Sequence, residues 1–162
     1  MELELGLRKV PKQTKDTGLY ILELELLNTF LFNHNKLGNY ELLPGYYYYI
    51  GSAQKNLEKR INRHLSNYKK KHWHIDFLTS IKDFLKSKTI VLREFEKEKE
   101  CKVVKKLENE FNLKYPIKSF GNSDCDSCKS HLLFSEIQIS YSHFCSLYQS
   151  AVLFIPSSNE TF

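Results

Sequence analysis

Two tyrosines and a basic pair have the clearest chemical potential in this sequence. Tyr20 closes the segment GLY, Tyr49 opens the segment YIG, and Arg60 and His64 follow shortly after. Arg60 and His64 are four residues apart, so on a helix they share one face. A guanidinium presents a fork of donors that fits a pair of phosphate oxygens. A phenol has a pKa of about 10, so it acts as a base at neutral pH only when a cation or a second base assists it. Together these groups suit chemistry on a phosphodiester.

Positive charge is concentrated around the same helix. The chain has 162 residues and a formal net charge of +5, and residues 56–72 hold six Lys or Arg against Glu58 alone. Lys and Arg gain affinity for a polyanion by displacing counterions from its phosphates. A solvated helix face on a lysine-rich protein is the alternative. We expect nucleic acid as the partner, with DNA favoured over RNA, contacted by Arg63, Lys69, Lys70, Lys71, His72 and His74.

A second group of ligand-type residues lies late in the chain. Cys125, Cys128 and His131 are spaced as Cys-x-x-Cys-x-x-His. A fourth ligand from His72, His74 or Asp76 could complete a tetrahedral zinc site. The alternative is a loop with free thiols.

Other features of the sequence bear on its location. The opening residues MELELGLRK lack the basic start and apolar stretch of a secretory signal. The longest apolar-biased stretch, 144–155, is too short to span a bilayer. We therefore expect a cytoplasmic protein with reduced thiols and no membrane partner.

The hydrophobic pattern predicts the elements that must position these groups. Alternation over 18–27 indicates a half-buried strand, and repeats at helical spacing indicate helices. Ser52 is a candidate cap for the first helix. The predicted strands are 18–27, 29–32, 46–50, 88–95 and 131–134; the predicted helices are 56–67, 72–85 and 98–113, with a loop at 115–131.

Within the run GYYYYIGSA, alternation turns Tyr46 and Tyr48 to one face of the strand and Tyr47 and Tyr49 to the other. We expect Gly51 to let the backbone turn towards the helix and to leave room for a bulky substrate.

This order of elements predicts an α+β domain over residues 14–135, with a small, mainly antiparallel sheet flanked by helices. A C-terminal helical tail would occupy 136–162. It could dock on the domain or join two copies in a homodimer. Its apolar residues fall on one helical face: Phe144, Leu147, Tyr148, Ala151, Val152 and Ile155.

The motifs resemble those of a known superfamily. GLY, YIG and Arg60-x-x-x-His64, in this order, are similar to the signature of the GIY-YIG nucleases. GYYYYIGSA, HWHIDFL, Glu100-Cys101 and FGNSDCDSCKSHLLF resemble the small Uri-type branch. That branch has an extra hairpin between the tyrosine motifs, which residues 28–44 would supply. The resemblance extends over about 18–134.

The resemblance implies a metal-dependent endonuclease that hydrolyses phosphodiester bonds in DNA, with RNA as the second substrate. Tyr20 would be the base or a proton relay, Tyr49 would hold the water or the phosphate, and Arg60 would stabilise the phosphate with His64 beside it. Glu100 would bind Mg²⁺ or Mn²⁺ with waters and substrate completing the shell. Glu108 is the second choice for this carboxylate, and Asn122 is the nearest match to a late superfamily asparagine.

Two other functions fit the same residues. A catalytically weak or inactive protein of this fold would bind nucleic acid through the basic helix without cleaving it. A small homodimeric structural protein would use the apolar tail, although it would leave the localised positive charge without a role.

Overall fold

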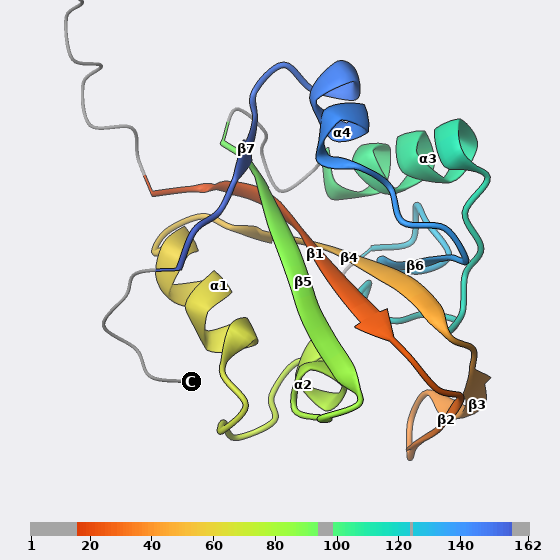
Figure 1. The fold of residues 1–162 in the computed structure, drawn as a ribbon. Helices are drawn as coiled ribbons and strands as arrows, with labels where there is room; N and C mark the ends of the chain where they lie inside the picture. The colour runs from red at the N-terminus through yellow and green to blue at the C-terminus, as the bar shows by residue number, and fades with distance from the viewer. Residues whose placement is uncertain (1–15, 94–98, 124, 157–162) are drawn as a thin grey trace, which may run out of the picture.

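The computed structural model describes residues 16–93, 99–123 and 125–156 (Figure 1). These residues form an α+β fold with a five-stranded antiparallel sheet in the order β6-β4-β1-β5-β7 and a separate β2–β3 hairpin. The strands are β1 (Gly18–Leu26), β2 (Phe30–His34), β3 (Gly38–Leu42), β4 (Gly45–Ala53), β5 (Phe84–Leu92), β6 (Leu132–Ser135) and β7 (Ala151–Leu153). The helices are α1 (Leu57–Leu65), α2 (His74–Thr79), α3 (Glu100–Phe111) and α4 (Tyr141–Leu147).

Helices cover both faces of the sheet (Figure 1). Leu57 and Ile61 of α1 and Leu78 of α2 pack on one face, together with the β2–β3 hairpin. Val104 of α3 and Phe144 of α4 belong to a second core on the other face. The predicted fold class is therefore confirmed, as is the predicted hairpin between the tyrosine motifs.

The central position of β1 corrects the expectation of a half-buried strand. Because β4 and β5 flank it and both faces are covered, its polar residues are buried as well. Glu23 is only 2% exposed, and its carboxylate is paired with Lys88 Nζ at 3.1 Å and accepts a hydrogen bond from Gln138 Nε2 at 2.7 Å. A buried carboxylate requires such partners, since an unpaired one would cost several kcal/mol.

The tyrosine run alternates as predicted. Tyr47 and Tyr49 lie in the core beneath α1 and α2, whereas Tyr46 and Tyr48 face the other core. Three of the hydroxyls serve the fold. Tyr47 donates to the carbonyl of Leu43 at 2.6 Å, Tyr48 accepts from the backbone N–H of Ile139 at 2.8 Å, and Tyr46 donates to Glu25 at 3.3 Å. Tyr49 is thus the member of the run without such a structural hydrogen bond among the described residues.

The second predicted helix is too long. α2 ends at Thr79, and β5 already begins at Phe84, because the Phe84 ring enters the core against Tyr47, with ring centroids 5.4 Å apart. Asn56, in the left-handed conformation with φ 55°, occupies the N-cap position of α1 without a capping hydrogen bond from its side chain. Ser52, the predicted cap, lies within β4.

The C-terminal segment also differs from prediction. Within the described residues 136–156, the helix is confined to Tyr141–Leu147, and Ala151–Leu153 forms β7, which pairs with β5 through Val152 and Val91. Phe144 is completely buried, so residues 136–156 contribute to the same sheet and core rather than to a separate helical tail. The edge of β5 offered unpaired backbone groups, and pairing them outweighs the helical pattern.

None of the described helices has the length and apolar character that a bilayer crossing requires.

Candidate functional site

A phenol, an imidazole and a carboxylate lie in a buried row between the sheet and the helices α1 and α2. The Tyr20 hydroxyl on β1 lies 2.8 Å from Nε2 of His64 on α1. His64 Nδ1 lies 3.6 Å from Oδ1 of Asp76 on α2. All three side chains are at most 2% exposed. The three side chains thus bring β1, α1 and α2 together, with a hydrogen bond between Tyr20 and His64 and a longer contact between His64 and Asp76.

Asp76 is held in place as an anion. Arg63 donates from both terminal nitrogens to its two carboxylate oxygens, each at 2.9 Å. The backbone N–H groups of His72 and Trp73 donate to Oδ2 at 2.8 and 2.9 Å. Burial by itself would raise the pKa of Asp76, but the nearby His64 imidazole and the hydrogen bonds from Arg63 and the two backbone groups outweigh it and hold that pKa below its usual value.

His64 is neutral at physiological pH. Burial lowers the pKa of His64 below its ordinary value, and this effect exceeds the opposing influence of Asp76; Lys69 and Arg63 lower it further. A carboxylate facing Nδ1 favours the tautomer with its proton there. Nε2 is then free to accept the hydrogen bond of the Tyr20 hydroxyl.

The His64 shift predicts how stability depends on pH. Because the pKa is lower in the folded protein than the value of about 6.5 in the unfolded chain, the unfolded state binds more protons below that pH. The free energy of unfolding should fall as pH drops from about 7.5 to about 5.5. Urea denaturation at each pH checks this. His64→Gln should lose part of the dependence, whereas His143→Gln, at an exposed position, should keep all of it. Equal dependence in both variants would contradict the assignment.

Gly51 has a different role from the predicted one. In the antiparallel register Gly51 lies opposite Tyr20, and the Tyr20 ring lies across it. A Cβ atom at Gly51 would stand 2.5 Å from the Tyr20 hydroxyl oxygen and 2.6 Å from the ring carbon that carries it. The space beside Gly51 is therefore filled by the tyrosine of the other motif, and glycine is required for that close approach.

Gly51→Ala is accordingly expected to displace the Tyr20 ring and break its hydrogen bond to His64. Overpacking of this kind costs about 1–3 kcal/mol of stability. Urea denaturation measures that loss. Since the hydroxyl moves as well, any reaction that depends on Tyr20 should slow to the level of Tyr20→Phe. An alanine variant with unchanged stability would show that the contact is not tight.

Tyr49 lies beside Tyr20 and His64, on the same face of the sheet. Its ring centroid is 6.4 Å from that of Tyr20 and 6.3 Å from that of His64. The ring also rests on Gly121, where φ is +74° and a Cβ would lie 2.8 Å from the Tyr49 ring. Tyr49 is 8% exposed, more than Tyr20 at 2%.

Arg60 and Glu100 meet at Ser52, on the part of β4 that β6 does not cover. β6 pairs with β4 only from Tyr46 to Tyr49. Beyond it, Arg60 of α1 donates to the Ser52 carbonyl at 2.8 Å, and the Ser52 hydroxyl donates to the Glu100 carboxylate at the start of α3. α1 and α3 belong to opposite faces of the sheet, and both contact Ser52 near the end of β4.

The charges of Arg60 and Glu100 affect the pKa values of Tyr20 and Tyr49. Burial raises the pKa of Tyr20 well above its usual value, Tyr49 and Glu100 raise it further, and Arg60 opposes them. Burial and Glu100 likewise raise the pKa of Tyr49, again opposed by Arg60. Both hydroxyls are protonated at neutral pH, and a positive charge close to Glu100 would favour their ionisation.

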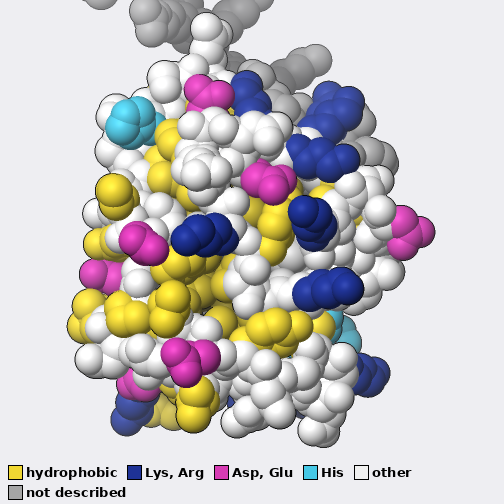
Figure 2. All heavy atoms as spheres, turned by 90° about the vertical axis from the view of Figure 1, so that its right-hand side faces the viewer, with side chains coloured by type: hydrophobic (Ala, Val, Ile, Leu, Met, Phe, Trp, Pro, Cys, Tyr) yellow, Lys and Arg dark blue, Asp and Glu magenta, His cyan; other side chains and the backbone are white. Residues whose placement is uncertain are grey.

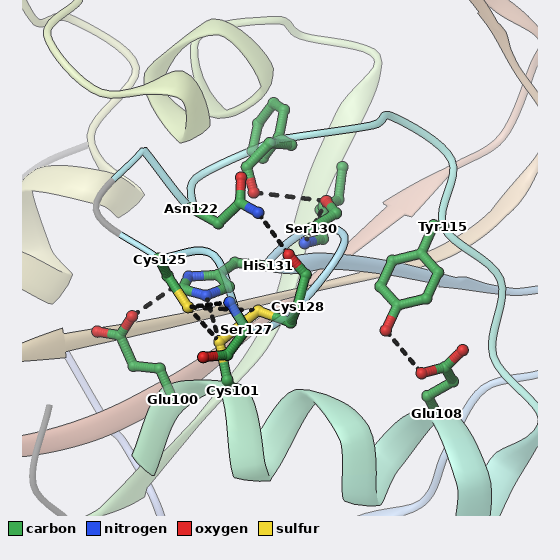
Figure 3. The surroundings of a disulfide bond; sticks show 12 residues. Glu100, Cys101, Glu108, Tyr115, Asn122, Cys125, Ser127, Cys128, Ser130 and His131 are labelled. Atoms are coloured by element: carbon green, nitrogen blue, oxygen red, sulfur yellow. Dashed lines mark hydrogen bonds and ion pairs between the residues drawn. A yellow bond between two sulfur atoms is a disulfide. The ribbon is translucent and has the colours of Figure 1, made fainter. Parts of the chain in front are cut away.

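Glu108 and Asn122, the alternative site residues, have neighbours outside the group around Ser52. Glu108 is eight residues beyond Glu100, or about 12 Å along the helix axis, and it accepts a hydrogen bond from the Tyr115 hydroxyl at 2.6 Å (Figure 3). The Asn122 side chain donates to the carbonyl of Cys128 at 2.7 Å and thereby shapes its own loop.

The predicted nucleic-acid contacts divide into two groups. Arg63 is bound to Asp76 and to the carbonyl of Lys70, and Lys69 Nζ donates to the carbonyls of Arg63 and His64, so both hold the end of α1. His74 Nδ1 accepts from the Gly121 N–H at 2.9 Å. The exposed side chains, which remain predicted contacts, are Lys70, Lys71 and His72.

A surface groove of about 890 Å³ runs along α1, and its cationic lining includes Lys55, Lys59 and Arg60. The guanidinium of Arg60 lies 5.0 Å from the centre of the Trp73 ring, and that of Arg63 lies 4.5 Å from it. Arg60 is thus oriented by an aromatic ring as well as by Ser52.

The structure adds basic residues that the sequence did not single out. A second groove, of about 1020 Å³, lies between the β2–β3 hairpin, α3 and the loop after it, and its lining includes Lys36, Lys105, Lys118 and Lys129. Figure 2 shows this side of the molecule, where Lys and Arg side chains gather along one half of the face. These lysines come from three distant segments, so no charge run marks them in the sequence.

The Cys/His cluster could hold a metal ion. The ligand atoms of Cys101, Cys125, Cys128 and His131 all lie within 4.8 Å of one another (Figure 3). The fourth member is Cys101, from the first turn of α3. For this position His72, His74 or Asp76 was predicted from the sequence, and Cys101 was not. The sequence leaves Cys101 and Cys145 equal as candidates, because only the fold decides which of them faces the loop.

The structure joins Cys101 and Cys128 by a disulfide, with Cα atoms 5.7 Å apart, a spacing that suits such a bond. The expectation of reduced thiols thus differs from the structure at this pair. Burial lowers the pKa of the neighbouring His131 to about 4.

A protein family matches most of the chain. The family described as "Domain of unknown function DUF123" matches residues 19–152, from the second residue of β1 into β7. No curated protein and no solved structure matches the chain. Since the match covers more than half of the sequence, the chain belongs to the DUF123 family.

Proposed function

We propose that this protein is a metal-dependent endonuclease of the GIY-YIG type that hydrolyses phosphodiester bonds in DNA. The observation that carries the proposal is the hydrogen bond between the Tyr20 hydroxyl and His64, beside Tyr49 and the Arg60–Ser52–Glu100 group. Each of these residues belongs to the motif set that resembles the superfamily.

In this reaction Tyr20 relays a proton. The attacking water gives a proton to the Tyr20 oxygen while the Tyr20 hydroxyl proton passes to His64 Nε2. The imidazolium formed is stabilised by Asp76 on its far side. The water oxygen bonds to phosphorus, and the bond from phosphorus to the leaving oxygen breaks. The leaving oxygen takes a proton from solvent, His64 afterwards releases its proton to solvent, and the products are a phosphomonoester and an alcohol. A relay avoids a free phenolate, which the raised pKa of Tyr20 disfavours.

Arg60 and Tyr49 bind the substrate. The guanidinium of Arg60 uses one nitrogen for Ser52, and its remaining donors stabilise charge on the phosphoryl oxygens. Tyr49 positions the water or the phosphate with a hydroxyl that bonds to none of the other described residues.

The Glu100 carboxylate is a suitable ligand for Mg²⁺ or Mn²⁺. Its oxygens are hard donors at a partly exposed position, with a side-chain exposure of 15%. In the described part of the chain, no cluster of three His, Cys, Asp or Glu includes Glu100, so waters and substrate phosphate must fill the remaining positions. Bound there, such an ion would polarise the phosphoryl group and stabilise the leaving oxygen. The Cys/His cluster has soft donors, and its ion is better assigned as zinc.

DNA is the proposed partner, with RNA as the second choice, and the cytoplasm is the proposed location. The groove along α1 supplies cationic side chains next to Arg60, and the groove beside α3 supplies a second set. Val152 and Ile155 are 54% and 80% exposed, whereas Phe144, Tyr148 and Ala151 are buried in the chain's own core. A homodimer would therefore have to use the exposed residues.

A cleavage assay tests the proposal. Supercoiled plasmid, single-stranded DNA and RNA are each incubated with the protein and either Mg²⁺, Mn²⁺ or a chelator. We expect cleavage of DNA that requires the cation. Salt-sensitive binding to all three without cleavage of any would instead support a nucleic-acid-binding module of the same fold. Absence of both binding and cleavage would contradict both readings.

A further inference from the structure

We propose that Cys101, Cys125, Cys128 and His131, in their reduced state, bind one zinc ion that fixes the first turn of α3 and with it Glu100. The zinc site stands by itself on the geometry of four residues. Its consequence for Glu100 rests in addition on the function proposed above.

The spacing of the donor atoms suits a tetrahedral ion. With bonds of about 2.3 Å to sulfur and about 2.0 Å to nitrogen, two sulfurs on one zinc lie about 3.8 Å apart, and a sulfur and a nitrogen about 3.5 Å apart. The sulfurs of Cys125 and Cys128 are 4.0 Å apart. Cys101 Sγ lies 3.5 Å from His131 Nε2. Two opposite edges of the tetrahedron are thus already present.

The donor set favours zinc and a closed site. Three thiolates and one imidazole are ligands that zinc prefers over magnesium or calcium. Because the protein would supply all four ligands, no position is left for substrate, which is the pattern of a structural zinc site. A thiol reductant first cleaves the Cys101–Cys128 disulfide by thiol–disulfide exchange, supplying two electrons and becoming a disulfide itself. Each protein thiol then gives up its proton when it binds the ion, and this binding step involves no change of oxidation state.

One ion at this place would link three parts of the fold. Cys101 lies in the first turn of α3, Cys125 and Cys128 lie in the loop, and His131 immediately precedes β6. Cys101 is separated from Cys125 by 24 residues and from His131 by 30. The ion would therefore cross-link the start of α3 to the loop and to the strand that pairs with Tyr46–Tyr49 of β4.

His131 connects the cluster to Glu100. Its Nε2 faces the sulfurs, and its Nδ1 lies 3.2 Å from Glu100 Oε2 (Figure 3). A metal-bound histidine commonly donates its second N–H to a carboxylate, which fixes the ring and the carboxylate together. Zinc on Nε2 would place the proton on Nδ1, and Glu100 would then be held by His131 on one oxygen and by Ser52 on the other.

The contacts of Cys101 point to a shared ion when the thiols are reduced. Besides its disulfide partner Cys128, Cys101 has Cys125 Sγ only 2.7 Å away, inside the contact distance of two unbonded sulfurs. A disulfide satisfies two of the three sulfurs and leaves Cys125 and His131 pressed against it. A zinc ion uses all four donors.

Zinc content tests the site directly. Protein purified in the presence of a thiol reductant and without added metal is expected to contain one zinc per chain by elemental analysis. Cys125→Ser and Cys128→Ser should each lower zinc affinity by about tenfold or more, measured by competition with a chromogenic chelator. Cys145→Ser is the matched control, since Cys145 lies on α4 outside the cluster, and it should keep full zinc. A reduced wild-type protein that neither contains nor takes up zinc, or equal loss in the control, would overturn the site.

Hydrogen exchange tests the effect on α3 without any activity assay. After zinc removal under reducing conditions, backbone amides of residues 103–106 should exchange faster, while amides of β1 serve as the internal reference. Unchanged exchange at α3 would overturn the positioning role. Glu100→Gln separates this proposal from the nuclease: it should retain zinc and lose cleavage. A wild-type protein that binds zinc but cleaves nothing would leave the zinc site standing and remove the proposed function alone.

Discussion

Tyr20→Phe is expected to lower the rate of DNA cleavage by about 10²–10⁴-fold, because it removes the hydroxyl that relays the proton from water to His64. The change deletes one oxygen and leaves the ring over Gly51. Stability should fall by only about 1 kcal/mol, the net contribution of one buried hydrogen bond. Single-turnover cleavage with saturating Mg²⁺ measures the rate, and urea denaturation measures the stability.

Tyr47→Phe is the matched control for this experiment. Tyr47 is a buried tyrosine on the same face of the sheet, and its hydroxyl bonds to the Leu43 carbonyl, away from His64. It should lose similar stability and keep its cleavage rate. If Tyr20→Phe cleaves as fast as wild type, the phenol is a packing residue and the relay is wrong.

Glu100→Gln is expected to reduce metal-dependent cleavage by at least about a hundredfold, since an ion that stabilises a transition state by several kcal/mol would lose the carboxylate ligand proposed for it. The amide has the same shape as the carboxylate and can still accept a hydrogen bond from Ser52, so the fold should be preserved. Cleavage rates over a titration of Mg²⁺ and of Mn²⁺ measure the effect.

Glu108→Gln provides the comparison on the same helix. Glu108 is hydrogen-bonded to Tyr115 and lies two turns from Glu100, so its loss should leave the titration unchanged. If activity is lost in Glu108→Gln and kept in Glu100→Gln, the metal ligand is Glu108 and not Glu100.

Local patterns were enough to predict most of the fold. The strand at Gly18–Leu26, the α1 helix and the alternation of Tyr46–Tyr49 depend on periodicity along short segments, and the structure confirms them. The secondary-structure predictions were wrong where pairing with a distant strand competes with the local preference of the sequence. Ala151–Leu153 has a helical pattern but completes the sheet at β5.

The basic residues illustrate the same limit at the candidate site. A charge run predicted Arg63 and Lys69 as contacts for nucleic acid, which stays a prediction; the fold shows in addition that Arg63 holds Asp76 and that Lys69 holds the end of α1. The sequence suggests Asp76 only as a metal ligand, since nothing in HWHID indicates that this carboxylate will face His64. Burial of the charge, and hence its need for partners, is visible only in the folded chain.

By itself the sequence determined the residue types, their order, and the periodicity that puts Arg60 and His64 on one helix face. The tertiary structure decided which of these groups meet: that Tyr20 rests on Gly51 and reaches His64, that α1 and α3 approach Ser52 from opposite faces, and that Cys101 rather than Cys145 joins the late cysteines. The physical reason is that periodicity acts over a few neighbouring residues. Tyr20–His64, Ser52–Glu100 and Cys101–Cys125 join positions 24 to 48 residues apart, and their distances depend on how the sheet and both helical layers pack.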